Sequence, residues 1–172
     1  MIWREAFTKF KTKKGARSSI EALLKRVEQG KELPSINPLV DLYNVISLTY
    51  ALPCGAEDLA KIEGNILLTK AKGNEHFVIL GSSELDSPHP EEIIYKDEFG
   101  AICRSLNWRE SARTFIEETT HDAFLCMELV DSERNHILLQ AMNHLAELIQ
   151  THLGGQVQLT ILDQKCPSFE FH

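Results

Sequence analysis

The sequence predicts a mixed α+β domain. Three features point to it: apolar residues at helical spacing over residues 20–27, several short strand-like runs between residues 65 and 130, and a long amphipathic helix over residues 132–153. No internal repeat or low-complexity linker divides the 172 residues, a length that suits one compact domain. We therefore expect residues 1–172 to form a single domain.

The first third of the chain is predicted to be helical. Residues 1–10 resemble the inside of a helix, and a second helix begins after Ser18, whose hydroxyl can accept an N–H while Glu21 reaches back in a capping box. Gly30 is typical of a residue that ends a helix. A third helix begins at Asn37-Pro38, because Asn can cap and Pro fits the first turn, where its missing N–H costs nothing.

The third helix is apolar on almost every side, which predicts a buried helix. Asp41, Asn44 and Ser47 nevertheless follow one another at i, i+3 and i+6 and form one polar ridge along it. Buried Asp and Asn side chains are costly unless they are hydrogen-bonded. Two interpretations stay open at this point: the ridge fixes a neighbouring loop, or it lines a pocket.

The remainder of the chain alternates strands and turns around one helix. Pro53-Cys54-Gly55 is predicted to be a turn. The helix over residues 132–153 is expected to end at Gly154-Gly155. The runs that predict strands cover residues 65–71, 76–80, 92–96, 101–106, 123–130 and 157–162.

The composition is close to that of an average globular protein, with 43% hydrophobic and 25% charged residues. No apolar run reaches the length that a membrane span needs. The four cysteines include no CxxC pair, and their spacing fits neither a zinc site nor a dense disulfide framework. We therefore expect a cytoplasmic protein in a reducing compartment, without a metal, a cofactor or a membrane partner.

The net charge of -7 argues against non-specific nucleic-acid binding, and we expect no DNA partner. The basic charge is uneven, however, because Lys13, Lys14 and Arg17 lie in one early segment together with further lysines. This segment is either a solvated face or a patch for an RNA backbone. Trp108 and Arg109 form a second candidate surface: Trp108 is a core residue, or the pair stacks on a base or ribose of RNA.

Several catalytic signatures are absent from the sequence: GxxxxGK[ST], a GxGxxG that opens a helix, GxSxG and HExxH. Their absence excludes most nucleotide hydrolases, dinucleotide enzymes, serine hydrolases and zinc proteases. Cys54 can in principle be nucleophilic, but a small core residue is the more usual role of a free cysteine.

Residues 33–44 (Leu-Pro-Ser-Ile-Asn-Pro-Leu-Val-Asp-Leu-Tyr-Asn) resemble a stretch of the phenylalanyl-tRNA synthetase beta subunit that ends Val-Asp-x-Thr-Asn-Tyr. Pro53, Asp58, Ile62-Glu63-Gly64 and Ala71 continue in register. The matched part is the tRNA-binding editing domain, built from the third and fourth modules (B3/B4) of that subunit. Residues 17–24 and 107–111 are similar to its free-standing bacterial relatives, and the resemblance extends over about residues 3–130.

The resemblance implies a β-sandwich-type sheet core flanked by helices. It also implies a pocket that, in the synthetase, hydrolyses tyrosine wrongly attached to the phenylalanine tRNA. Asn44 matches the pocket asparagine of the family, while Thr120 and Glu128 are similar to its threonine and pocket glutamate. The family's histidine falls on Gly55 and its threonine on Tyr43, so the pocket is reshaped and tyrosine is not assumed to be the rejected residue. Family members usually carry an N-terminal segment with a strand, and the resemblance implies that this chain is shortened there.

We therefore predict a tRNA-binding protein that acts as a trans-editing hydrolase and deacylates a mischarged aminoacyl-tRNA, with the tRNA 3′ end as its partner. Asn44 would orient substrate or water, and backbone N–H groups around Gly55 would stabilise the oxyanion. The predicted substrate contacts are Asp41, Tyr43, Ser47, Cys54, Thr120 and Glu128. Two alternatives stay open: a non-catalytic module that binds tRNA, an amino acid or a small metabolite, and a scaffold in which the ridge is sealed by backbone partners.

Overall fold

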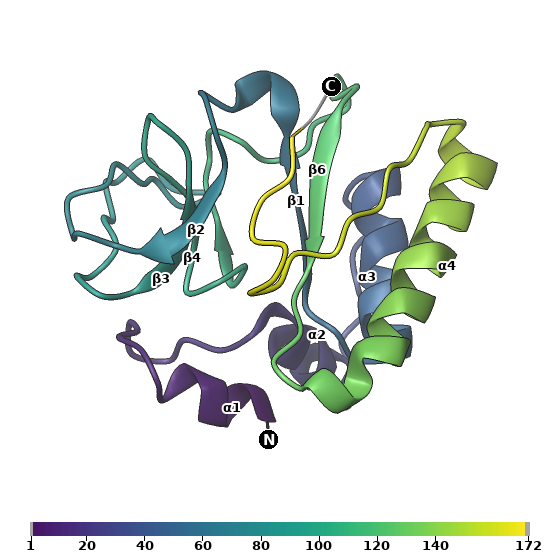
Figure 1. Cartoon of the computed structure of the whole chain (residues 1–172), viewed down its shortest axis with the longest axis horizontal. Helices are drawn as coiled ribbons and strands as arrows, with labels where there is room; N and C mark the ends of the chain where they lie inside the picture. The colour runs from purple at the N-terminus through teal and green to yellow at the C-terminus, as the bar shows by residue number, and fades with distance from the viewer. Residues whose placement is uncertain (1, 171–172) are drawn as a thin grey trace.

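The computed structural model describes residues 2–170. Four helices and two antiparallel sheets make up the fold, so the predicted α+β class is confirmed (Figure 1). The elements, with two short 3₁₀ helices (η), are α1 (Ile2–Phe7), α2 (Ser19–Glu28), α3 (Pro38–Tyr50), β1 (Cys54–Asp58), η1 (Leu59–Lys61), β2 (Leu67–Lys70), β3 (Ile93–Lys96), β4 (Ala101–Arg104), β5 (Arg109–Glu110), β6 (Ala123–Met127), η2 (Ser132–Arg134) and α4 (Asn135–Leu153).

The sheets differ in size and lie next to each other. One pairs β1 with β6, and the other has the order β2-β3-β4-β5. Helices α3 and α4 cover the outer face of the β1–β6 pair, and the four-stranded sheet lies on its other side (Figure 1). A hydrogen bond from the Cys103 thiol to Glu57 Oε1, 2.9 Å long, joins β4 to β1 between the sheets.

The helix boundaries follow the caps that the sequence predicts. Ser18 accepts a hydrogen bond from the backbone N–H of Glu21, and Asn37 accepts one from the N–H of Leu39. The glutamate half of the predicted capping box is used differently, because the Glu21 carboxylate binds the guanidinium of Arg4 on α1. This ion pair ties the first two helices together at the surface.

Three predicted segments differ in the structure. The turn predicted at Pro53-Cys54-Gly55 is wrong, because residues 54–58 form β1, which is buried along its whole length and pairs with β6. Residues 76–80 make only isolated bridges to residues 85, 100 and 111 instead of a continuous strand. Residues 157–162 alternate in the sequence but form no strand, since no neighbouring backbone pairs with them among residues 2–170.

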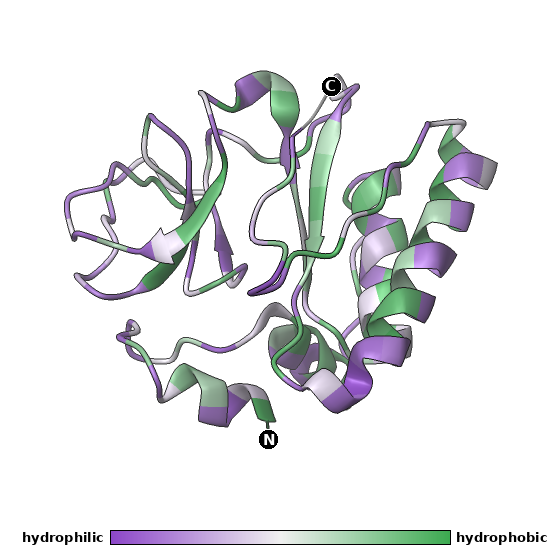
Figure 2. Ribbon diagram, in the orientation of Figure 1, coloured by the Kyte–Doolittle hydropathy of each residue, from purple (hydrophilic) through white to green (hydrophobic). Residues whose placement is uncertain are grey.

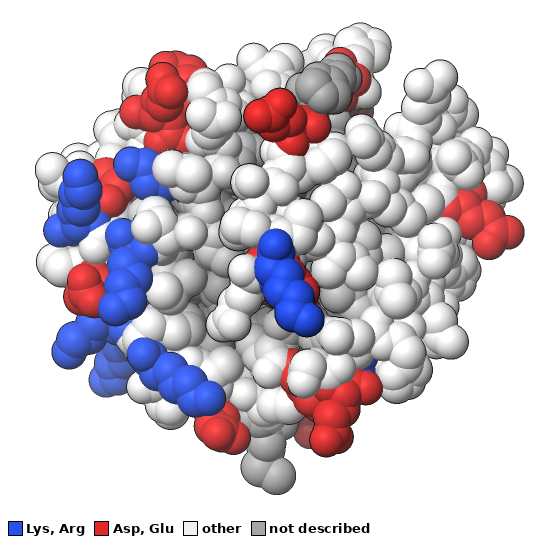
Figure 3. Space-filling view, viewed as in Figure 1, with Lys and Arg blue, Asp and Glu red and all other residues white. Residues whose placement is uncertain are grey.

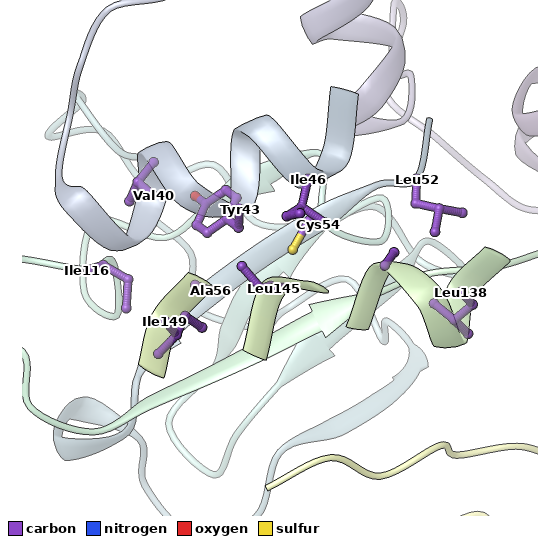
Figure 4. Packing of buried hydrophobic residues seen from close by; sticks show 11 residues of the cluster. Val40, Tyr43, Ile46, Leu52, Cys54, Ala56, Ile116, Leu138, Leu145 and Ile149 are labelled. Carbon is purple, nitrogen blue, oxygen red and sulfur yellow. The ribbon is translucent and has the colours of Figure 1, made fainter. Parts of the chain in front are cut away.

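The main core lies between the two long helices and the β1–β6 pair (Figure 4). Ile46 of α3, Ala56 of β1 and Ala141 of α4 are at most 2% exposed. Apolar residues also predominate on β6 and on the inner sides of the helices (Figure 2). Burial of this surface, at roughly 25 cal/mol per Å², is the main force that holds β1 and β6 against the helices.

Candidate functional site

A groove of about 2000 Å³ opens between β6, α4 and the segment that follows α4. One wall is β6 with the preceding loop, residues 116–122, and another is the inner side of α4. The segment 155–170, yellow in Figure 1, returns from the end of α4 towards β6 and β1 and forms part of the rim. Most of the lining is apolar, so a polar group on its inner wall is informative.

Glu128 is such a group. It directly follows β6, where its N–H donates to the carbonyl of Pro53, and its side chain lines the groove although the residue is only 8% exposed. Its Oε1 atom accepts the backbone N–H of Asn107 at 3.1 Å. Its Oε2 atom is buried and receives no well-aligned hydrogen bond from the described residues, although the Tyr95 hydroxyl lies beside the carboxyl group.

Burial raises the pKa of Glu128 from 4.5 to about 8, while the Tyr95 hydroxyl and the Asn107 N–H beside it act in the opposite direction. The carboxyl group is therefore mostly protonated at neutral pH. A protonated carboxyl group both donates and accepts hydrogen bonds. Glu128 can thus act as a hydrogen-bond donor as well as an acceptor in the wall of the groove.

Asn107 lies between Glu128 and β1. Its Oδ1 atom accepts the hydroxyl of Ser19 at 2.9 Å, and its Nδ2 atom is buried without a partner. A Cβ atom built on Gly55 would lie 3.2 Å from the Asn107 Cβ, so the missing side chain at Gly55 is what lets the asparagine come close. Gly55 and Glu128 are therefore brought together, with Asn107 between them.

The turn that carries Asn107 connects β4 to β5 and has an unusual backbone. Ser105 and Leu106 both have positive φ angles, 50° and 60°, which non-glycine residues rarely adopt. The Ser105 hydroxyl donates to the buried carboxylate of Glu92 at 2.8 Å, and the Leu106 N–H donates to the carbonyl of Ile93. These bonds offset the backbone strain and fix the position of Asn107.

The polar ridge of α3 is used mainly by the neighbouring backbone. Asp41 accepts the hydroxyl of Ser35 at 2.5 Å and the N–H of Ile36 at 2.9 Å, so it fixes the loop before the helix. Ser47 donates to the carbonyl of Leu52 at 2.6 Å, just past the end of the helix. For these two positions the geometry matches the loop-fixing interpretation of the ridge.

The other predicted contacts divide between groove and core. Thr120 lines the groove, and its hydroxyl donates to Asp58 at 2.8 Å. Tyr43 and Cys54 point into the main core (Figure 4), where burial raises the pKa of both side chains, so neither hydroxyl nor thiol ionises readily. Asn44 is half-buried on α3 and lines neither the groove nor the smaller hollow described next.

The five residues predicted to contact RNA come together on the surface. Lys13, Lys14, Arg17, Trp108 and Arg109 all line one hollow of about 570 Å³, which we call the basic hollow. Sequence reasoning missed four further cations that line it: Lys25, Arg26 and Lys31, which lie on α2 and just after it, and Arg104 of β4. The sequence shows that Lys25 and Arg26 lie on the polar side of an amphipathic helix. It does not show that this helix lies beside β5.

Sequence reasoning also missed Tyr95 and Ser19 in the site. No pattern marks them, because Tyr95 belongs to β3 and Ser19 to α2, and only the fold brings them to Glu128 and Asn107. Among residues 2–170, no group of three His, Cys, Asp or Glu side chains is arranged to hold a metal ion. No helix in that part of the chain is long and apolar enough to cross a membrane.

The arrangement of helices and sheets has a counterpart among solved structures. An N-terminal fragment of the phenylalanyl-tRNA synthetase beta subunit from Pyrococcus horikoshii superposes with a TM-score of 0.56, over 69% of this chain and 40% of that one. At 18% sequence identity this likeness establishes the fold alone.

The B3/4 domain model matches residues 2–154, and this chain therefore belongs to the B3/4 domain family. Phenylalanine–tRNA ligase beta subunits are similar in sequence: that of Shewanella oneidensis is 35% identical over 91 residues, 53% of this chain and 11% of the relative. That of Mycoplasma genitalium is 33% identical over 98 residues, 57% of this chain and 12% of the relative. The chain thus spans only about a tenth of the length of these relatives.

Proposed function

We propose that this protein binds the aminoacylated 3′ end of a tRNA in the groove and hydrolyses the ester bond of a mischarged aminoacyl-tRNA. The proposal is supported by membership of the B3/4 family and by relatives that are phenylalanine–tRNA ligase beta subunits. The groove is large enough for an aminoacyl group and its terminal nucleoside, since ligand pockets commonly measure ~300–1,000 Å³.

One observation carries the proposal: Glu128 lines a mostly apolar groove, and one of its carboxyl oxygens, Oε2, is buried without a well-aligned hydrogen bond. Leaving a buried polar atom unsatisfied costs about 1–3 kcal/mol, so a native structure tends to keep such an atom where a ligand completes it. A polar group of the acylated amino acid would do so here.

The reaction needs little covalent machinery, because an aminoacyl ester is already activated. A water molecule attacks the carbonyl carbon, the bond to the ribose oxygen breaks, and the proton from water passes to that ribose oxygen, which leaves as a hydroxyl group. The protein contributes position and hydrogen bonds. The protonated Glu128 donates to an oxygen of the acyl group, and the Nδ2 amide of Asn107 is a further unused donor beside it.

A non-catalytic binding module is the second candidate function. It is favoured by two observations: Asn44, the predicted catalytic residue, does not line the groove, and the thiol of Cys54 is buried in the core. Such a module would use the same groove to hold tRNA, an amino acid or a metabolite without turnover. Catalysis by Asn44 remains a prediction that the Asn44→Ala variant in the experiment below tests, and the role of the Gly55 backbone also remains a prediction.

The test is deacylation of a panel of mischarged tRNAs by the wild type and by Glu128→Ala, Glu128→Gln and Asn44→Ala variants. Loss of one oxyanion donor typically lowers turnover by about 10²–10³-fold, which is the effect expected of Glu128→Ala. Glu128→Gln keeps a neutral donor and should retain more activity. The exposed Glu84→Gln substitution is the matched control. If the protein binds the mischarged tRNAs saturably but cleaves none of their esters faster than buffer alone does, the hydrolase proposal is wrong and the binding module takes its place.

A further inference from the structure

The basic hollow holds a large share of the positive charge of an acidic protein. It is lined by residues 13–17, by α2 and the residue Lys31 after it, and by β5 with the turn before it. Eight of the chain's 18 lysines and arginines line it, together with a single acidic residue, Asp86. From this concentration we infer that the basic hollow binds the phosphodiester backbone of the tRNA whose 3′ end enters the groove.

Most of this charge is not neutralised by the protein. Lys13 and Arg104 are paired, the first with Asp86 and the second with Asp86 and Glu92. Six other cations make no ion pair with a described acidic residue: Lys14, Arg17, Lys25, Arg26, Lys31 and Arg109. Cations held close together without partners repel one another, and a bound polyanion relieves that repulsion.

The hollow also offers a flat surface. The Arg109 guanidinium lies over the ring of Trp108, 4.5 Å from the ring centroid, and the half-buried ring contributes to the lining. Stacked aromatic and guanidinium planes are a common way to hold an RNA base or ribose. This feature favours a nucleic acid over a free inorganic anion, which needs charge but no plane.

The unpaired cations of the basic hollow come from separate segments of the chain, which suits contacts with successive phosphates of an RNA backbone. Lys14 and Arg17 come from the loop after α1, and Lys25 and Arg26 from the last turns of α2. Figure 3 shows many Lys and Arg side chains at the end of the molecule that holds the β2–β5 sheet and the loop after α1. Several point charges at separate positions can each contact a different phosphate of one strand.

The groove and the basic hollow meet at one turn. Leu106 lines the groove, Trp108 lines the basic hollow, and Asn107 between them donates its N–H to Glu128. The rigid turn therefore separates two sites that share no lining residue. In the inferred complex, an RNA strand bound in the hollow has its 3′ end beside this turn, near the point where Glu128 lines the groove.

The inference rests on the proposed function for the identity of the ligand, and salt titration tests it directly. Affinity for deacylated tRNA, which carries no amino acid, is measured by fluorescence anisotropy between 50 and 200 mM salt. The wild type is compared with the Lys14→Gln/Lys25→Gln double variant. Log affinity falls as log salt rises, and each phosphate contact contributes ~0.7–0.9 to the steepness of that fall. Removing two contacts should therefore make the slope shallower by about 1.4–1.8. Over that salt range the wild type then loses roughly seven- to twelvefold more affinity than the variant.

The charge-matched control is Lys70→Gln/Lys72→Gln, two exposed lysines outside the hollow. Its slope should equal that of the wild type. An unchanged slope in Lys14→Gln/Lys25→Gln, or an equal fall in both double variants, would overturn the inference. Binding of a sulfated polysaccharide with the same affinity and slope as tRNA would also overturn it, because the hollow would then be a general polyanion site.

Hydrolysis of aminoacyl-adenosine, which has no phosphate, separates this inference from the proposed function. Lys14→Gln/Lys25→Gln should cleave it at the wild-type rate, while Glu128→Ala should not. Slower cleavage of aminoacyl-adenosine by the lysine variant would contradict the separation of the two sites. If the wild type fails to cleave the ester but the tRNA salt slopes differ as expected, the hydrolase proposal falls and the basic hollow stands.

Discussion

Replacing Glu128 by Gln should change how the stability of the protein depends on pH. Gln has nearly the shape of a protonated Glu but does not titrate. Burial raises the pKa of the wild-type carboxyl group to about 8, against about 4.5 when it is exposed to solvent in the unfolded chain. Between these two values the unfolded chain releases a proton that the folded protein keeps, so rising pH favours unfolding. The contribution of Glu128 to stability is complete below about pH 4.5 and is lost as the pH rises towards 8.

The size of the effect follows from the pKa. One pH unit in this window corresponds to about 1.4 kcal/mol, so the window from pH 5 to pH 7.5 corresponds to at most about 3 kcal/mol. Water that enters the groove beside the carboxyl group lowers this, and we expect about 2–3 kcal/mol. The free energy of unfolding of Glu128→Gln, minus that of the wild type, should therefore rise by this amount between pH 5 and pH 7.5.

The assay is urea denaturation followed by the fluorescence of Trp3 and Trp108, at several pH values for each protein. Glu57 and Glu110 are also buried acids with raised pKa values, but their contributions cancel in the difference between variant and wild type. Only the group that was replaced changes the difference.

Asp97→Asn is the matched control. Burial raises the pKa of Asp97, but the N–H of Glu63 and the side chain of Arg113 outweigh it and hold the pKa below its ordinary 3.8. This carboxylate is ionised in both states above about pH 5, so the Asp97→Asn variant should show a penalty that is constant from pH 5 to pH 7.5. A difference for Glu128→Gln that is equally flat would refute the protonated state of Glu128.

Two further substitutions test the packing that positions the site. In Gly100→Ala the new methyl carbon would lie 2.4 Å from the backbone oxygen of His76, so we expect the free energy of unfolding, measured by urea denaturation, to fall by about 1–3 kcal/mol. The control is Gly155→Ala, where the methyl carbon meets only ordinary contacts and stability should change by less than about 0.5 kcal/mol. Equal effects would show that Gly100 is not closely packed. Arg104→Met leaves the fully buried Glu92 without its charge partner and should cost about 3–5 kcal/mol at pH 7, with a smaller loss at pH 4. A loss that does not depend on pH would contradict this explanation.

The sequence predicted the helices well because their signals are local. The caps at Ser18 and Asn37 and the apolar stripe of α4 act within one or two turns of the chain. β1 was missed because Pro53 and Gly55 are typical of turns, whereas the strand is stabilised by pairing with β6, about 70 residues later in the chain. Its short, fully buried run has no alternation to reveal it.

The candidate site was predicted only in part. Glu128 and Gly55 were singled out through the resemblance, and the structure brings them together, but Asn107 was noticed only as part of the similar stretch 107–111. Its role depends on the positive φ angles of Ser105 and Leu106, which no composition or periodicity predicts in non-glycine residues. The basic segment before α2 was visible from its charge, but its junction with Trp108 required the fold.

If the groove beside Glu128 holds the aminoacyl end of a tRNA, as we propose, a ligand bound there should protect the groove walls from hydrogen exchange. Hydrogen–deuterium exchange with a non-hydrolysable amide analogue of aminoacyl-adenosine tests it most directly, because the analogue cannot turn over. We predict that the amides of residues 120–129 and of the turn at residues 105–108 become protected when the analogue binds. Protection confined to the outer surface of α2 or α4, with residues 120–129 unchanged, would contradict the account.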